Sequence, residues 1–547
     1  MSLQKSTLLI VRLLKRQPNG LYNMKQLIHH GVYIPEYKPI GLTLKYEGRF
    51  LELNPETEQM AVAFVKKFGT AYVKDPTFVT NFLEDFTKKL GIPKRANIED
   101  FDWTNILNYI EDEKKKKENL TKEERKRLSE ERKKYREALK EKYGYAIVDG
   151  TKVVIQNWMV EPPGIFVSKG KNPLRGRWKS AVTRKDITLN LSEKPKDLEE
   201  GWKAIVWRSD CMWIACWRNP LNGKMKYVWF SPNSKIRQDK EIKKWEKAQE
   251  LRRNIREVEK HVRRNLTSKD VDRRKVATAV YLIKESGIRV GDERIAGEMG
   301  TIGCTTLKPE NVRIEGQKVI LDFVGKDYVQ WHRELILPSI VLKNLKMFKE
   351  QAQNGSIFNG INSQKVSRFL QEVTPGVSAK TFRTMIAGET LKKAINDTKN
   401  LFGKDEFQGI IRFKYINCAV AKRLNHKKKL PDKFEEKLRK RQEKMEKRKV
   451  EYEELKKKLI DKKEAGKLLS KKLEKAEKLY QKAKLEFEVY RDTSEWNLST
   501  SLNSYIDPRH VVEYARRNHI DINHLYSKSL REKFSWALGE STQTIYN

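Results

Sequence analysis

The spacing of apolar and charged side chains changes character several times along this 547-residue chain. Residues 111–143 consist of lysine, arginine and glutamate runs without a glycine or a proline, which is typical of exposed helices. Thr121 and Glu124 have the spacing of a capping box, in which each residue satisfies the other's free backbone N–H. The pattern therefore predicts one or two charged, solvent-exposed helices over this range.

Alternating apolar side chains predict β-strands in the region that follows. Asp149-Gly150 separates two such runs, and an Asp-Gly step is typical of a two-residue β-hairpin. Three more apolar runs, separated by turn residues, predict a meander: residues 203–207, 211–217 and 226–230.

Residues 236–425 have a mainly helical pattern with one β-hairpin, whose turn is Gly325-Lys326-Asp327. One helix is expected to begin near Ser268 and end at Gly287, and another to be capped by Ser378. An apolar helix is expected to end just before His426.

A second charged zone, residues 433–491, carries apolar side chains at heptad spacing, which predicts a coiled coil. Its second half has the clearer seam: Leu469, Leu473, Ala476, Tyr480, Ala483, Phe487 and Tyr490. A reversal at residues 461–466 would make an antiparallel arm. We predict a multidomain α+β protein with these domains: an N-terminal half (1–235), a helical domain (236–432), the arm (433–491) and a C-terminal domain (492–547).

Charge narrows the choice of partner. Lys and Arg number 114 against 73 Asp and Glu, a formal net charge of +41. Such an excess favours a long polyanion, nucleic acid ahead of a membrane surface. A charged fraction of 34% excludes a membrane-spanning protein, and the apolar run at residues 7–14 is short for a spanning helix and lacks a signal-cleavage site.

Cysteine usage indicates an intracellular, reducing compartment. The four cysteines have no CxxC spacing and no histidine cluster beside them, so buried thiols are expected rather than a zinc site.

Motif searches exclude several enzyme classes. The chain has no GxxxxGK[ST] phosphate loop, no GxSxG and no HExxH, which argues against ATP dependence and against a metal-dependent nuclease. What remains is a set of basic side chains on ordered segments, namely Arg289, Lys326, Arg383 and His426. Taken singly, each of these residues is explained equally well as a surface ion pair, a turn residue, a phosphate contact or a helix cap.

Several short sequence motifs, taken together and in order, resemble those of the eukaryotic-type DNA topoisomerase IB family, and the resemblance runs from about residue 20 to the C-terminus. They are Glu-Pro-Pro-Gly-Ile-Phe (161–166), Ile-Arg-Val-Gly-Asp-Glu (288–293), Asp-Phe-Val-Gly-Lys-Asp (322–327), Ser-Ala-Lys-Thr-Phe-Arg-Thr (378–384), Leu-Asn-His-Lys (424–427), Leu-Asn-Ser-Tyr-Ile-Asp-Pro-Arg (502–509) and Tyr-Ser-Lys-Ser-Leu-Arg-Glu-Lys-Phe-Ser-Trp-Ala (526–537). The resemblance implies a tyrosine-recombinase-like catalytic domain in a monomeric clamp around duplex DNA, bound largely without sequence preference. It also implies catalytic roles for Arg289, Lys326, Arg383 and His426, with Tyr505 as nucleophile.

The chemistry of these residue types agrees with that implication. A tyrosine phenol has a pKa of about 10 and needs help in losing its proton before it attacks a phosphodiester. Two arginines and a histidine can stabilise the charged transition state without a metal ion, and a lysine can protonate the leaving 5′-oxygen. Transesterification conserves the bond energy, so neither ATP nor another cofactor is expected, although a divalent cation could stimulate product release.

The resemblance also implies further DNA contacts at Lys169, Lys171, Arg175, Asp327, Lys380 and Ser504. Lys169 and Ser504 replace the family's usual Arg and Asn beside the nick, where camptothecin-type drugs bind, so drug resistance is expected. The family's long Lys-rich N-terminal region is nearly absent, which suggests a compact version with a virus as one candidate source. The expected location is the nucleus, with a viral factory or virion as the alternative.

Two other readings stay open. A tyrosine site-specific recombinase has a similar catalytic set, and relaxation of a plasmid without a target sequence would separate the two. A non-enzymatic nucleic-acid binder would account for the charge and the heptads but would form no covalent adduct with DNA.

Overall fold

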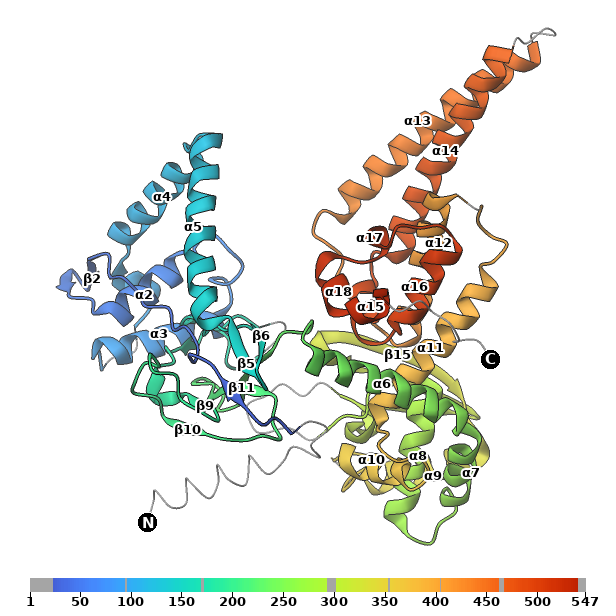
Figure 1. Cartoon of the computed structure of the whole chain (residues 1–547), viewed down its shortest axis with the longest axis horizontal. Helices are drawn as coiled ribbons and strands as arrows, with labels where there is room; N and C mark the ends of the chain where they lie inside the picture. The colour runs from blue at the N-terminus through green and yellow to red at the C-terminus, as the bar shows by residue number, and fades with distance from the viewer. Residues whose placement is uncertain are drawn as a thin grey trace. The chain divides into compact units, whose positions relative to one another are not determined.

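The fold is that of a computed structural model, which describes residues 23–93, 96–168, 172–292, 302–352, 355–403, 405–461 and 467–539. The chain folds as two units, each with its own hydrophobic core (Figure 1). Unit 1 consists of Met1–Asp239 and Ile295–Met299, and unit 2 of Lys240–Arg294 and Gly300–Asn547. The division into four domains stays a prediction.

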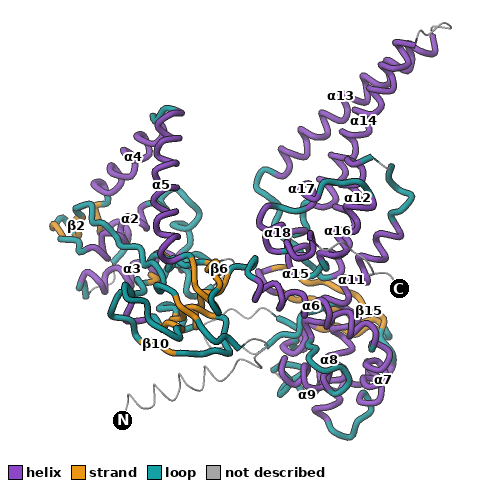
Figure 2. The backbone as a smooth tube through the Cα atoms, viewed as in Figure 1, coloured by secondary structure: helices purple, strands orange, loops and turns teal. Residues whose placement is uncertain are grey.

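Unit 1 contains a seven-stranded sheet, seen as strands in Figure 2. Its order is β1 (Leu27–Ile28), β5 (Tyr145–Val148), β6 (Thr151–Gln156), β12 (Met225–Phe230), β11 (Trp213–Arg218), β9 (Thr188–Asn190) and β10 (Ala204–Val206). The predicted hairpin is confirmed, because β5 and β6 pair antiparallel across Asp149 and Gly150, whose φ angles are 48° and 78°. Positive φ at both central residues is what a type I′ turn requires.

The predicted meander is wrong in its first strand. β11 and β12 pair antiparallel as expected, but β9 lies between β10 and β11, and β10 runs parallel to β9. The Asn190 side chain accepts the N–H of Arg208 at 2.8 Å and donates to the carbonyl of Trp213 at 3.1 Å, so it ties both neighbouring segments to β9. A three-residue strand has too few positions for its alternation to be recognised in the sequence.

A helical lobe completes unit 1. Helices α2 (Pro55–Val65) and α3 (Pro76–Leu90) pack through Phe64 and Phe82, whose rings stack at 4.0 Å, beside a small sheet of β3 (Arg49–Leu51), β2 (Leu44–Tyr46) and β4 (Phe101–Asp102). The short strands β7 (Gly164–Ile165) and β8 (Trp178–Lys179) pair separately. The predicted charged helices are α4 (Thr104–Glu118) and α5 (Lys122–Tyr143), and the Thr121–Glu124 capping box is confirmed.

Unit 2 is mainly helical. Its helices before the arm are α6 (Lys235–Arg253, which begins in unit 1), α7 (Ile255–Asn265), α8 (Val271–Ser286), α9 (Ser339–Gln351), α10 (Ser363–Gln371), α11 (Ala379–Asp397) and α12 (Glu406–Arg423). The predicted hairpin is confirmed as β14 (Lys318–Gly325) and β15 (Val329–Ile336). A third strand, β13 (Val312–Glu315), which the pattern does not indicate, joins its edge.

The predicted arm consists of α13 (Phe434–Asp461) and α14 (Lys467–Thr493), which lie side by side in Figure 1. Phe434 stacks on Tyr490 at 5.5 Å and Tyr452 on Tyr480 at 6.0 Å, so the two helices are antiparallel. Residues 462–466, in which the predicted reversal falls, lie outside the described residues. The apolar seam therefore packs within the hairpin itself, as the heptads predict.

Up to residue 539, where the description of the structure ends, five short helices follow the arm: α15 (Leu498–Ser504), α16 (Pro508–Arg517), α17 (Ile522–Leu525), α18 (Lys528–Lys533) and α19 (Ser535–Gly539). In this segment Ile506, Val511 and Phe534 are fully buried in the same core as α8, α11 and α12. The C-terminal segment is thus built into unit 2 by hydrophobic packing.

All four cysteines are buried and free, as expected from their spacing. Burial raises the pKa of the Cys216 thiol to about 12 and that of Cys418 to about 11. Within the described residues, no helix combines the length and the apolar character needed to cross a membrane.

Buried His29 predicts a pH-dependent stability of unit 1. Its Nε2–H donates to the Asn190 carbonyl at 2.9 Å and its Nδ1 accepts the Gly31 N–H at 3.0 Å, and this second contact requires an unprotonated Nδ1 and therefore a neutral ring. Burial lowers the pKa of His29 to about 4. Between pH 6.5 and 4 the unfolded chain therefore binds a proton that the folded chain does not, and stability falls as the pH falls.

The expected loss is about 2 kcal/mol between pH 7.5 and pH 5, from roughly 1.4 kcal/mol per pH unit below the unfolded value of about 6.5. Urea unfolding of the full chain at the two pH values, followed by hydrogen exchange in unit 1, measures it. His29→Gln should lose less over the same interval because an amide does not titrate. Equal losses in the two proteins would contradict this role of His29.

Candidate active site

Arg383 is held inside unit 2 by the start of α11. The N–H of Ser378 donates to Thr381 Oγ1 at 3.0 Å, which fixes the first turn of the helix and confirms the predicted cap position. One turn later the Arg383 side chain is only 3% exposed, and its Nη2 donates to the Leu424 carbonyl at 3.0 Å. The guanidinium carbon lies 5.0 Å from the centre of the Tyr505 ring.

His426 lies three residues after the end of α12. Asn425, at φ 53°, turns the chain, and the His426 N–H donates back to the Ala421 carbonyl at 2.8 Å. The imidazole is buried: Nδ1 lies 2.8 Å from Ser501 Oγ and Nε2 lies 3.4 Å from Arg383 Nη2. Its ring centre is 5.0 Å from that of Tyr505, so three of the predicted residues meet in one cluster.

Tyr505 ends α15 and is 8% exposed. Its N–H donates to the Ser501 carbonyl at 2.9 Å. Two lysines hold the carbonyls just before it: Lys533 Nζ donates to Asn503 O at 2.7 Å and Lys244 Nζ to Ser504 O at 3.4 Å. Through these contacts helices α6 and α18 fix the backbone that presents the phenol.

The cluster is a buried, positively charged environment. Burial, together with the charge of Arg289, lowers the pKa of Arg383 to about 10, so the guanidinium stays charged at neutral pH. Burial and the charges of Arg383 and Arg289 lower the pKa of His426 to about 3, so the imidazole is neutral. Arg383 Nε and Nη1 are buried without a hydrogen-bond partner in the described part of the chain. Two unsatisfied cationic donors beside a phenol are suited to the oxygens of an anion.

Arg289 lies where α8 ends. Gly287 adopts φ 73°, and a Cβ at this position would come within 2.9 Å of the Arg423 carbonyl, so the glycine permits both the turn and the contact with the end of α12. Arg289 is half-buried, and its charge acts on both Arg383 and His426. The predicted end of the helix at Gly287 is therefore confirmed, and Arg289, two residues later, is close enough for its charge to act on the cluster.

Lys326 lies at the tip of the β14–β15 hairpin and is exposed. β15 is anchored to the segment that carries His426: Arg333 Nη2 donates to Arg423 O at 3.2 Å, and Asn425 Nδ2 donates to Gln330 O at 3.1 Å. No contact joins the Lys326 ammonium to Arg383, His426 or Tyr505 in the structure as described. The fold thus anchors the hairpin beside the cluster and leaves its tip exposed.

The other predicted DNA contacts are more scattered. Lys380 is exposed on the first turn of α11, and Ser504 is half-buried at the end of α15. Arg175, in unit 1, pairs with Asp75 at 3.0 Å. Lys169 and Lys171 lie outside the described residues, as does the side chain of Asp327. Their role in binding DNA stays a prediction.

Side chains that no motif singled out also shape the site. Ser501 contacts His426, while Glu241 lies 2.7 Å from Lys244 and 3.8 Å from Lys533. Only Ser501 had a signal in the sequence, since it lies four residues before Tyr505 and shares a helical face with it.

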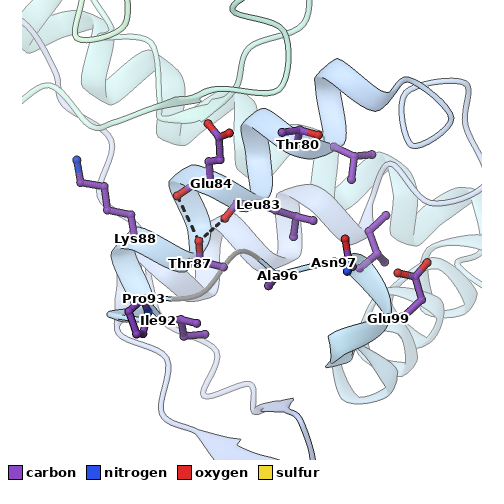
Figure 3. A pocket seen from close by; sticks show the side chains of 12 residues that line it. Thr80, Leu83, Glu84, Thr87, Lys88, Ile92, Pro93, Ala96, Asn97 and Glu99 are labelled. Carbon is purple, nitrogen blue, oxygen red and sulfur yellow. Dashed lines mark hydrogen bonds between the residues drawn. The ribbon is translucent and has the colours of Figure 1, made fainter.

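One cavity borders this cluster, and another lies in unit 1, apart from it. One of about 580 Å³ is bordered by Tyr505 and by basic side chains that include Arg252 and Lys392. Another, of about 500 Å³, lies in unit 1 against α3, where the Thr87 hydroxyl is bonded back to its own helix (Figure 3). The second cavity is lined by none of the predicted catalytic residues.

Three family models match successive parts of the chain. The model described as eukaryotic DNA topoisomerase I, DNA binding fragment, matches residues 22–230. The one described as eukaryotic DNA topoisomerase I, catalytic core, matches residues 233–459, and the C-terminal topoisomerase domain matches residues 477–544. The catalytic-core match contains Arg289, Arg383 and His426, and the C-terminal match contains Tyr505.

Individual relatives agree with these matches. DNA topoisomerase 1 alpha of Arabidopsis thaliana is 32% identical over 95% of this chain, and DNA topoisomerase 1 beta of the same plant is 30% identical over 95%. DNA topoisomerase 1 of Homo sapiens is 29% identical over 96% of this chain and 72% of its own length. The matched region spans 59% of the length of each Arabidopsis relative.

Proposed function

The chain belongs to the eukaryotic DNA topoisomerase I family, and from this we propose that it is a type IB DNA topoisomerase that relaxes supercoils of both signs. The observation that carries the proposal is the buried contact between Arg383, His426 and Tyr505. These three side chains come from α11 and from the segments just after α12 and α15, and they meet around a phenol with buried cationic donors that can bind an anion. The substrate is double-stranded DNA, bound largely without sequence preference by a monomer in the nucleus.

In the proposed reaction the Tyr505 phenol gives its proton to a water molecule, and its oxygen attacks the scissile phosphorus. A 3′-phosphotyrosine bond forms, the bond to the 5′-oxygen breaks, and the freed strand end rotates before it attacks the phosphotyrosine in reverse. Arg383 and Arg289 stabilise the charge on the non-bridging oxygens, and the Arg383 charge beside the ring also stabilises the developing phenolate. His426, neutral at working pH, adds a hydrogen bond from Nε2–H.

No step of this scheme requires energy input. Each transesterification exchanges one phosphodiester bond for another, so religation proceeds without ATP. The side chains that stabilise charge are all cationic or neutral donors of the chain itself, and we propose that no metal ion is obligatory.

Lys326 is proposed as the general acid that protonates the leaving 5′-oxygen. Its exposure at a hairpin tip allows it to reach bound DNA. Lys326→Ala should slow single-turnover cleavage by about 10²- to 10⁴-fold on an ordinary oligonucleotide. On a substrate with a 5′-bridging sulfur, whose thiolate needs no proton, the variant should cleave nearly as fast as the unmodified protein. An equal defect on both substrates would exclude the general-acid role.

Binding to DNA should depend steeply on salt. If the excess of +41 charges acts on phosphates, log K falls with log salt concentration at a slope of about −0.9 per neutralised phosphate. Fluorescence anisotropy with Tyr505→Phe, which prevents cleavage, measures the slope on two unrelated duplexes. We expect a loss of roughly 10³-fold between about 50 and about 200 mM salt on both. A flat affinity would contradict phosphate-dominated binding.

A further inference from the structure

We propose that Ser501 is a positioning residue that holds His426 with its Nε2–H toward the scissile phosphate when DNA is bound. The inference rests on the proposed function, because it concerns how His426 presents a hydrogen-bond donor to the scissile phosphate. In this proposal Ser501 acts only through His426 and does not touch the DNA.

The geometry couples Ser501 to both His426 and Tyr505. Ser501 Oγ lies 2.8 Å from His426 Nδ1, and the two residues are 0% and 5% exposed, so water has little access to this contact. The Ser501 carbonyl accepts the N–H groups of Tyr505 and Ile506, both at 2.9 Å. The His426 carbonyl in turn accepts the Asn497 N–H at 2.6 Å, one residue before α15 begins. One short helix therefore fixes the hydroxyl, the imidazole and the phenol together.

The chemistry explains why a hydroxyl is needed at this position. A neutral imidazole carries one proton, and burial together with the nearby charges of Arg383 and Arg289 keeps the ring neutral. An oxyanion near Nε2 requires the proton on that nitrogen, so Nδ1 must accept a hydrogen bond. The Ser501 O–H supplies it. Since a hydroxyl both donates and accepts, the same contact also suits the other tautomer, in which Nε2 accepts from Arg383 Nη2 across 3.4 Å.

Binding of a phosphate therefore favours one of two arrangements that the free protein accommodates. The proton moves from Nδ1 to Nε2 and the Ser501 hydroxyl turns from acceptor to donor, with no change in net charge. Without the hydroxyl, Nδ1 loses its buried partner in either tautomer, and nothing holds the ring with its donor toward the substrate.

The kinetic test compares Ser501→Ala with Ser499→Ala, which removes a hydroxyl from an exposed position of the same helix. Single-turnover cleavage of a suicide oligonucleotide should fall by about 10- to 100-fold in Ser501→Ala, by analogy with other hydrogen bonds that orient a functional histidine. The DNA affinity of both variants and the cleavage rate of Ser499→Ala should stay within about twofold of the values for the unmodified protein. Ser501→Cys, with a weak S–H donor, should recover part of the rate. Full-rate cleavage by Ser501→Ala would overturn the proposal.

A second measurement does not depend on activity or on how Ser501→Ala folds. The measurement is ¹⁵N NMR of histidine-labelled Tyr505→Phe bound to uncleaved duplex. The His426 signals are identified by their loss when His426→Gln is added to this variant. They should show an unprotonated Nδ1 and a protonated Nε2. A protonated Nδ1 in the DNA complex would overturn the proposal. Absence of cleavage by the unmodified chain would instead remove the proposed function, so the two failures are distinguishable.

Discussion

Tyr505→Phe is expected to abolish cleavage and relaxation of DNA while DNA affinity stays within about twofold. The substitution removes only the phenolic oxygen, which is the nucleophile in the proposed reaction. The ring remains to pack against His426 at 5.0 Å and against the Arg383 guanidinium. Loss of a covalent nucleophile typically costs many powers of ten, and a fall of at least about 10³-fold is expected here.

A matched control comes from the same C-terminal segment. Tyr526 is 1% exposed, and its hydroxyl is buried without a hydrogen-bond partner among the described residues. Tyr526→Phe therefore makes the same chemical change in the same core and should relax plasmid at the unmodified rate. Residual relaxation by Tyr505→Phe at more than a few per cent, measured on supercoiled plasmid, would exclude Tyr505 as the nucleophile.

The second large effect is expected for Arg383. Arg383→Ala removes the two buried, unpartnered N–H donors and the charge beside the phenol, so single-turnover cleavage should fall by at least about 10²- to 10³-fold. Arg383→Lys restores the charge but not the planar fork that reaches the Leu424 carbonyl and a substrate oxygen together, and it should recover only part of the loss.

Arg516→Ala is the control for charge alone, since it removes a cation from an exposed face of α16. It should cleave at the unmodified rate. The two Arg383 variants should keep their DNA affinity within a few fold, because binding is spread over many phosphate contacts. If Arg383→Ala lost binding and cleavage in the same proportion, the residue would belong to the binding surface and not to transition-state stabilisation.

Features that depend on local sequence were predicted well. The Thr121 capping box, the Asp149-Gly150 hairpin and the end of α8 at Gly287 each follow from backbone chemistry within a few residues. The antiparallel arm follows from a repeat sustained over seven apolar positions.

Features that depend on distant partners were not predicted. β9 and β13 are strands only because of the segments they pair with, and β9 in particular is inserted between two runs that look adjacent in the sequence. The Asn190 side chain ties β9 to Arg208, just after β10, and to Trp213, at the start of β11, so its amide joins two separate backbone segments. No local pattern specifies such contacts.

The same distinction applies to the site. Arg383, His426 and Tyr505 each have an ordinary local explanation, and it was their motifs, taken in order, that grouped them. The structure brings these three side chains into contact, with Arg289 close enough to act on two of them. Lys244 and Lys533 could not be assigned beforehand because their partners lie on another helix, and for Ser501 the sequence indicates only a helical face shared with Tyr505.

The central claim is a covalent bond between Tyr505 and a 3′-phosphate of DNA. The most direct measurement incubates the full chain with a suicide oligonucleotide in EDTA without ATP, stops the reaction with denaturant, and identifies the DNA-linked peptide by mass spectrometry after protease digestion. The account predicts one modified peptide, containing Tyr505 linked to a 3′-phosphate, and a free 5′-hydroxyl on the released strand. A linkage to another residue, a 5′-phosphate linkage, or no adduct with DNA bound would contradict it.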